Sequence, residues 1–115
     1  MIFCHIVDDY YLQGWLASAK QKKWWEENAP DDMYKYDYIM ALIMHSMSWS
    51  FMIMLPVAIW MNFQITYKFL IIWAVNTIIH GITDNAKANL FIINLIEDQL
   101  IHLIQIIITA CLFLN

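Results

Sequence analysis

Residues 90–114 read LFIINLIEDQLIHLIQIIITACLFL, the clearest apolar stretch of the chain. A helix needs about 20 apolar residues to cross the roughly 30 Å hydrocarbon core of a bilayer. The stretch is long enough for one crossing, although Asn94, Asp98 and His102 interrupt it. It therefore predicts a membrane-spanning helix that carries polar groups inside the membrane.

Three other stretches extend this pattern along the chain. Residues 38–61 and 65–84 are predicted as spans, and Pro56 is expected to kink or loosen the first of them. Residues 2–19 are shorter and more polar, so we expect a helix that enters the membrane and packs against the others, with an interfacial or re-entrant helix as the alternative. The sequence thus predicts an all-α fold, a polytopic membrane bundle of about four helices in one domain.

The composition agrees with a membrane protein and argues against several soluble classes. Hydrophobic residues make up 62% of the chain and charged residues 14%, whereas soluble domains carry about 25% charged residues. A chain with so few polar groups cannot cover a surface that faces water, so the expected partner is the lipid bilayer. The net charge is −4, with six lysines and no arginine, which argues against nucleic acid because phosphate binding needs a basic surface.

The lysines predict which side of the membrane each loop faces. The loop at residues 20–37, KQKKWWEENAPDDMYKYD, holds four lysines and the aromatic residues that favour a membrane–water boundary. Lys87 follows the span at 65–84, and Lys68 alone is expected on the opposite side. Since cytoplasmic loops carry an excess of lysine, we expect 20–37 in the cytoplasm, both termini outside, and the chain in the cytoplasmic (inner) membrane.

Polar residues recur at intervals of three or four within the predicted spans, which places each set on one face of its helix. Three of the four histidines have an aspartate four residues away. The sets are His5, Asp9 and Gln13 with Asp8 alongside and Lys20 beyond; His45 with Ser48 and Trp49; Asn76, His80, Asp84 and Lys87; and Asn94, Asp98, His102 and Gln105. In the predicted topology these faces lie at similar depths, in the cytoplasmic half of the membrane.

Buried ionisable groups need partners inside a membrane. An aspartate at the centre of a span costs about 2.5–3.5 kcal/mol on insertion scales, unless it is paired, hydrated or bound to a cation. Carboxylates and imidazoles bind divalent metals, and an i, i+4 pair can place two ligands on one ion. The predicted metal ligands are His5, Asp9, His45, His80, Asp84, Asp98 and His102. They suit two metal ions, or one ion with an outer layer of Asp–His hydrogen bonds, and zinc is expected before manganese or iron.

Three other interpretations of the same residues stay open. The Asp–His pairs, and amides such as Asn76, can be hydrogen bonds that hold helices or copies of the chain together. The polar faces can also form a path for a proton or an ion. Haem ligation by two histidines is the weakest of the three, because it leaves the aspartates unexplained.

The motifs resemble those of a family of small membrane proteins from bacteria and their phages, catalogued as domain of unknown function 3307. The family pattern is H-x3-D-x2-LQ followed by a lysine, a lone histidine that opens a span, N-x3-H-x3-D-x2-K, and DQ-x2-H. This chain has HIVDDYYLQ from His5 to Gln13 and then Lys20, His45, NTIIHGITDNAK from Asn76 to Lys87, and DQLIH from Asp98 to His102. The resemblance covers almost the whole chain and implies its layout but no activity. A looser similarity to membrane-bound metal-dependent hydrolases with H-x3-D motifs implies hydrolysis by analogy.

Together these residues predict a membrane-embedded, metal-dependent hydrolase that acts on a lipid or phosphoester headgroup near the cytoplasmic surface. One carboxylate left off the metal, from Asp9, Asp84 and Asp98, is expected to act as general base. The predicted substrate-binding residues are Gln13, Lys20, Asn76, Lys87 and Gln99. The two lysines are equally well explained as positive-inside anchors. The alternative is a non-enzymatic membrane protein, such as a phage factor that acts on a host membrane protein, or a homo-oligomer.

Overall fold

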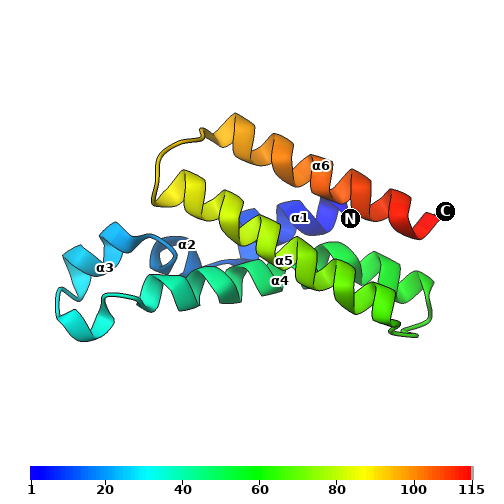
Figure 1. Cartoon of the computed structure of the whole chain (residues 1–115), viewed down its shortest axis with the longest axis horizontal. Coiled ribbons are helices and arrows are strands. Elements are labelled where there is room, and N and C mark those ends of the chain that lie inside the picture. Colours follow the sequence, from blue (N-terminus) through cyan, green and yellow to red (C-terminus); the bar gives the residue numbers. More distant parts are fainter. Residues whose placement is uncertain (115) are drawn as a thin grey trace.

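Three long helices lie lengthwise beside one another and form the body of the molecule (Figure 1). They are α4 (Asp37–Trp60), α5 (Tyr67–Ala88) and α6 (Leu95–Leu114). The computed structural model describes residues 1–114, and within them it contains helices and connecting segments but no β-strand. The all-α prediction is therefore confirmed, in a molecule that measures 48 × 27 × 22 Å.

The N-terminal third is a series of short helices rather than one continuous helix. It consists of α1 (Ile2–Val7), the π-helix η1 (Asp8–Leu12), α2 (Leu16–Ala19), α3 (Lys22–Asn28) and the 3-10 helix η2 (Asp32–Tyr34). The helix predicted over 2–19 is interrupted at Gly14, whose φ of +49° a residue without a Cβ adopts at little cost. The first segment consequently packs along α4 in separate short pieces.

A tight turn joins α4 to α5 and sets the two helices antiparallel (Figure 1). Within this turn Asn62 and Phe63 adopt left-handed backbone conformations, with φ values of +49° and +58°. Helix α4 agrees with the span predicted at 38–61, whereas α5 continues past Asp84 to Ala88. The antiparallel pairing brings the inner faces of α4 and α5 into contact along their length.

Helix α6 begins at Leu95, later than residue 90, because a capping box fixes its first turn. The Asn94 side chain accepts hydrogen bonds from the amides of Ile96 and Glu97 at 2.8 and 3.0 Å. In return, the Glu97 carboxylate accepts one from the Asn94 amide at 2.8 Å. This reciprocal pattern is typical of a helix N-terminus. Asn94 is therefore a helix cap, although its spacing predicts a place on the polar face of the span.

The molecule is polar inside and apolar outside. Among residues 1–114, fifteen buried side chains are polar or charged and ten are hydrophobic, which reverses the usual arrangement of a soluble domain. Large apolar side chains such as Ile71, Ile78 and Ile108 are more than half exposed on the outer faces of the helices. The apolar core that does exist comprises Trp49, Ile53, Met54, Val57, Ala58, Phe69 and Ile106.

Two helical segments among the described residues are long and apolar enough to cross a membrane. They are Asp32–Trp60, which includes α4, and α6. Helix α5 is more polar, because it carries Asn76, His80 and Asp84 on its buried face. Length and composition thus support two crossings, and a bundle of four spans stays a prediction.

Candidate metal centre

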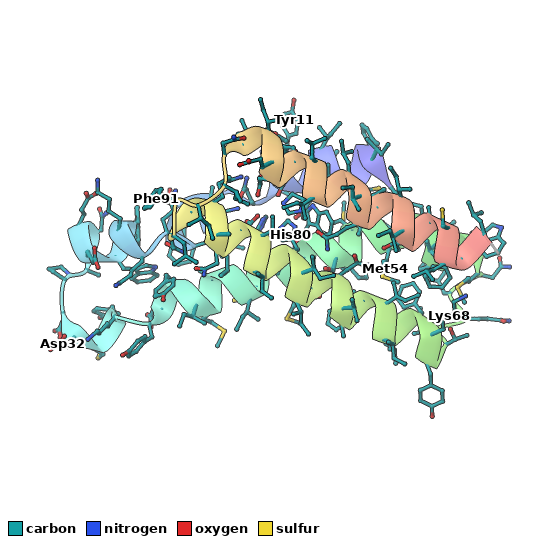
Figure 2. The ribbon with its side chains drawn as sticks, turned by 45° about the horizontal axis from the view of Figure 1, so that its top comes forward. Tyr11, Asp32, Met54, Lys68, His80 and Phe91 are labelled. Carbon is teal, nitrogen blue, oxygen red and sulfur yellow. The ribbon has the colours of Figure 1, made fainter. Side chains whose placement is uncertain are left out.

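The polar faces of the helices meet in the middle of the molecule, where Figure 2 shows His80 between them. All seven predicted metal ligands are buried, and they come from α1, η1, α4, α5 and α6. They are His5, Asp9, His45, His80, Asp84, Asp98 and His102. The structure therefore brings together side chains that are up to 97 positions apart in the sequence, as their spacing predicts.

Asp84 lies at the centre of this cluster and approaches three imidazoles. Its Oδ2 atom is 3.4 Å from His45 Nε2. Its Oδ1 atom is 3.4 Å from His102 Nε2 and 3.7 Å from His80 Nε2. One carboxylate thus links ring nitrogens from α4, α5 and α6.

The separations between ligand atoms suit atoms that share an ion. Two atoms bound to one zinc at about 2.1 Å, with angles of about 90–110°, lie about 3.0–3.5 Å apart. His45 Nε2 is 3.2 Å from His80 Nε2 and 3.3 Å from Asp9 Oδ1, and His102 Nε2 is 3.4 Å from Asp98 Oδ1. Two groups have ligand atoms that all lie within 4.8 Å of one another: Asp9, His45 and His80; and His80, Asp84 and His102. Both groups could hold a metal ion.

Gln105 determines which nitrogen of His102 carries the proton. The Gln105 amide nitrogen donates to the backbone and side-chain oxygens of Asn76 at 3.2 and 3.3 Å, so Gln105 Oε1 accepts from His102 Nδ1 at 3.2 Å. A neutral His102 protonated on Nδ1 turns the lone pair of Nε2 toward Asp84 and Asp98. In the described part of the chain, His102 Nε2 and Asp98 Oδ1 have no hydrogen-bond partner. A cation between them would satisfy both atoms.

His5 lies at the edge of the cluster with both ring nitrogens engaged. Trp49 can only donate, and its indole N–H gives a hydrogen bond of 2.7 Å to His5 Nδ1. The His5 proton is therefore on Nε2, which donates to Gln99 Oε1 at 3.1 Å. The nearest carboxylate, that of Asp9, is 3.7 Å from His5 Nδ1. His5 thus positions its neighbours, and six of the seven predicted ligands keep an atom directed into the cluster.

Asp8 is a buried member of the cluster that the spacing did not single out. Consecutive residues of an α-helix diverge by about 100°, so only one of Asp8 and Asp9 is expected to face inward. The π-helix η1 widens the turn at this point, and both carboxylates are buried. Asp8 accepts a hydrogen bond of 2.7 Å from Ser48, and its other oxygen is 4.0 Å from His45 Nδ1. The acidic pair within an apolar segment was the available signal for it.

The predicted substrate-binding lysines are paired with aspartates of the cluster. Lys20 Nζ is 2.5 Å from Asp84 Oδ2, and Lys87 Nζ is 2.5 Å from Asp98 Oδ2. Lys20 is buried, whereas the Lys87 side chain is 30% exposed. Gln99 donates to the same Asp98 oxygen at 3.0 Å. Of the two lysines, Lys87 is therefore the one that a molecule outside the bundle can reach.

Two other predicted substrate-binding residues brace the helices. Asn76 donates to Thr109 Oγ1 at 2.8 Å and so connects α5 to α6. Gln13 directly follows η1, and its side-chain amide donates to the backbone carbonyl of Asp9 within η1. These amides hold the segments that carry the ligands.

With neutral histidines and ionised aspartates, the charges of the cluster do not cancel. Asp8, Asp9, Asp84 and Asp98 contribute four negative charges, and Lys20 and Lys87 contribute two positive charges, so the sum is −2 when the histidines are neutral. An uncompensated charge costs several kcal/mol in a buried site. One divalent cation would remove this excess.

A stack of three rings joins the apolar core, through Trp49, to the cluster, through His80 and His102. The fully buried Trp49 stacks on His80 with ring centroids 4.2 Å apart, and His80 stacks on His102 at 4.3 Å. The interplanar angles are 18° and 29°. The stack fixes the planes of the two imidazoles, so their nitrogens stay directed at Asp84.

Two open grooves flank the cluster. One, of about 500 Å³, lies between α1, η1 and α6, and its walls include Ile6, Tyr10 and Leu103 around His5 and Gln99. The other, of about 470 Å³, lies between α4 and α5 and is lined mainly by apolar residues. The first groove reaches polar atoms of the cluster and offers a route to it from the side of the bundle.

Comparison with protein families, curated proteins and solved structures found no match for this chain. The resemblance to the family catalogued as domain of unknown function 3307 therefore stays a prediction. A function has to be inferred from the chemistry of the cluster and from the surface around it.

Proposed function

We propose that the chain is an integral protein of the cytoplasmic membrane that binds a divalent metal ion between its helices and hydrolyses a lipid or phosphoester headgroup. The arrangement of polar and apolar residues supports the membrane location. Exposed aliphatic side chains cover the outside of the long helices, and the ionisable groups are inside. Lipid accepts such an outer surface, whereas water does not.

The distribution of lysine supports the predicted topology. Lys20, Lys22, Lys23, Lys35 and Lys87 lie toward the end of the bundle that holds α2 and α3, and Figure 2 shows Lys68 at the opposite end. Both chain ends lie toward the Lys68 end (Figure 1). The lysine-rich end would face the cytoplasm, with the termini on the other side.

Aromatic residues support a membrane surface at the lysine-rich end. Trp15, Trp24 and Trp25 form edge-to-face contacts, with ring centroids 5.0–5.9 Å apart. Tyr34 stacks on Trp25 at 6.2 Å. Tryptophan and tyrosine favour the headgroup region, where the ring is in an apolar environment and the polar atom meets water.

The contacts at the two ends of residues 1–20 support a fourth membrane crossing by this segment, although it is broken into short helices. Met1 packs against the apolar core that includes Val57, near the end of α4. At the other end of the segment, the Lys20 carbonyl accepts a hydrogen bond of 3.1 Å from Asn89, just after α5. Residues 1–20 therefore extend along the bundle from one end of the helix pair toward the other, and buried contacts supply partners at the breaks.

The observation that carries the metal proposal is the free lone pair of His102 Nε2 beside two carboxylates. His80, Asp84, Asp98 and His102 provide two nitrogen and two oxygen ligands on one side of the cluster. Zinc accepts this mixed set, and manganese or iron are the alternatives; a catalytic ion would use three of these four ligands and keep a position open for water. Bound there, the ion would polarise a phosphoryl oxygen and activate water.

The residues on the other side of the cluster would supply proton transfer. Asp9 and His45 lie 3.3 Å apart and outside the four-ligand set. Asp9 would take a proton from the attacking water as its oxygen bonds to phosphorus, and would return the proton to the alcohol oxygen that leaves. The partly exposed Lys87 would attract the anionic headgroup, and the groove beside His5 and Gln99 would hold the lipid tail.

Metal analysis of the full chain, purified in detergent, tests this proposal. We expect bound zinc, manganese or iron in the wild type and its loss in His80→Ala and His102→Ala. Asn94→Ala, which alters a helix cap, is the matched control and should keep the metal. Metal-free wild type with an intact circular dichroism spectrum would exclude the metal site. Hydrolysis of a panel of lipid phosphoesters then tests the reaction.

The lysine contacts favour a second candidate, a non-enzymatic protein that binds or conducts a proton or ion. Lys20 and Lys87 neutralise two carboxylates directly, so the cluster can be partly balanced without a metal. In this case the histidines would accept protons. Proton or cation flux in liposomes that contain the metal-free protein would favour this candidate over the hydrolase.

A further inference from the structure

We infer that the centre holds a single divalent ion and that the ammonium group of Lys20 takes the place of a second one. The inference rests on the proposed metal site and specifies its stoichiometry. The cluster has ligand groups for two ions, but the contacts of Asp84 and Asp98 differ in a way that leaves one position for a metal and gives the other to a lysine.

The two ligand groups share His80, which can serve one ion. The first group contains Asp9 and His45, the second contains Asp84 and His102, and His80 belongs to both. A neutral imidazole nitrogen has one lone pair and therefore binds one metal. If His80 joins the second group, the first group keeps only Asp9, His45 and the second oxygen of Asp84.

That second oxygen is already occupied. Asp84 Oδ2 is the atom that faces His45, and Lys20 Nζ contacts it at 2.5 Å. Asp84 Oδ1 has no lysine contact and faces His80 and His102. A metal ion can therefore use Oδ1 while Lys20 stays in place, but an ion that needs Oδ2 has to displace the ammonium group.

Unlike Lys20, Lys87 does not contact the aspartate oxygen that a metal ion would use. It contacts Asp98 Oδ2, which also accepts from Gln99, and it leaves Asp98 Oδ1 without a hydrogen-bond partner beside His102. Lys87 therefore stabilises Asp98 through Oδ2, and Oδ1 stays available to the proposed ion. Only Lys20 lies where a metal would bind.

The charge of the cluster agrees with one ion. With neutral histidines and ionised aspartates, four carboxylates and two ammonium groups leave −2, and one divalent ion brings the sum to zero. A second divalent ion would leave +2 in a buried site unless a lysine leaves the cluster or loses its proton, or further anions bind, and such an excess is unfavourable.

Lys20 is held in place by its backbone as well as by Asp84. It follows α2 directly as the C-terminal cap residue, and its carbonyl accepts a hydrogen bond of 3.1 Å from Asn89. Only 7% of the residue is exposed. Asn89 also accepts from the amide of Lys22 at 2.7 Å, so the chain on either side of Lys20 is tied to the end of α5.

Metal stoichiometry in matched variants tests the inference. The full chain in detergent is equilibrated with excess zinc and, in a second series, manganese, and then desalted and analysed by mass spectrometry. We expect about one equivalent in the wild type, about two in Lys20→Met, and about one in Lys87→Met, since only the first variant frees a ligand oxygen between the groups. Lys20→Gln serves as a second variant if Lys20→Met does not fold.

The outcomes separate this inference from the proposed function. Two equivalents in the wild type would overturn the single-ion inference and leave the metal-dependent function standing. One equivalent in both folded Lys20 variants would also overturn it, because the ammonium group would then not be what excludes a second ion. A wild type that binds no metal would overturn both.

Discussion

His45 Nε2 and His80 Nε2 lie 3.2 Å apart, and the residues that follow them, Ser46 and Gly81, form a close contact between α4 and α5. A Cβ atom on Gly81 would lie 3.0 Å from Ser46 Oγ, which is tighter than ordinary packing. Ser46 Oγ cannot turn away freely, because it donates to the Leu42 carbonyl at 2.7 Å. The absence of a side chain at Gly81 therefore allows the two histidines to meet.

Gly81→Ala should weaken metal binding without unfolding the protein. The added methyl group would push α5 away from α4, and such overpacking costs about 1–3 kcal/mol. Part of this cost would appear as a roughly tenfold lower metal affinity, since about 1.4 kcal/mol corresponds to tenfold. Competition with a chromogenic chelator measures the affinity. The double variant Ser46→Gly, Gly81→Ala removes the clash and should recover most of it; no recovery would show that the contact does not control the site.

Replacement of His5 should have a much smaller effect than replacement of His102. Glutamine at position 5 can accept from Trp49 and donate to Gln99, as His5 does. His5→Gln should therefore keep its metal, with affinity reduced less than about tenfold, whereas His102→Gln should lose the ion because it removes a ligand. Elemental analysis of the two variants side by side measures this. Equal loss from both would place His5 among the ligands.

The spacing of the polar residues was sufficient to predict the part of the site that lies on the long helices. His80 and Asp84, and Asp98 and His102, are four residues apart in uninterrupted α-helices, so the period of 3.6 directs each pair to one face. The expected cost of placing these groups singly in lipid then predicted that the faces meet. Both inferences depend on regular helices, and they hold in α4, α5 and α6.

The N-terminal segment could not be predicted in the same way because it is not a regular helix. The π-helix turns Asp8 inward together with Asp9, and the backbone adopts a left-handed conformation at Gly14, which interrupts the helix. The aspartates that pair with Lys20 and Lys87 could not be predicted from the sequence either, because a long flexible side chain can reach either solvent or the cluster. Asn94 has the spacing of a site residue but its contacts are those of a cap.

Gln105→Leu should lower the metal affinity although the residue is not a proposed ligand. The change removes the acceptor that keeps the proton of His102 on Nδ1, and loss of such outer hydrogen bonds costs about 10–100-fold in metal affinity. Gln64→Leu, in the exposed turn between α4 and α5, is the control and should bind metal like the wild type. Chelator competition distinguishes the two. Unchanged affinity in Gln105→Leu would mean that the proton position of His102 does not matter for binding.

The lysine-rich end should face the cytoplasm, and single cysteines test this directly. Asn28 follows the lysines of α3 and Asn62 lies in the α4–α5 turn, and both are exposed. In a chain with Cys4→Ala and Cys111→Ala, a membrane-impermeant maleimide should label Asn62→Cys in intact bacterial cells, and Asn28→Cys only after the cells are permeabilised. The reverse pattern would invert the topology. Equal labelling of both in intact cells would mean that α4 does not cross the membrane, and the buried aspartates would then need an explanation other than lipid.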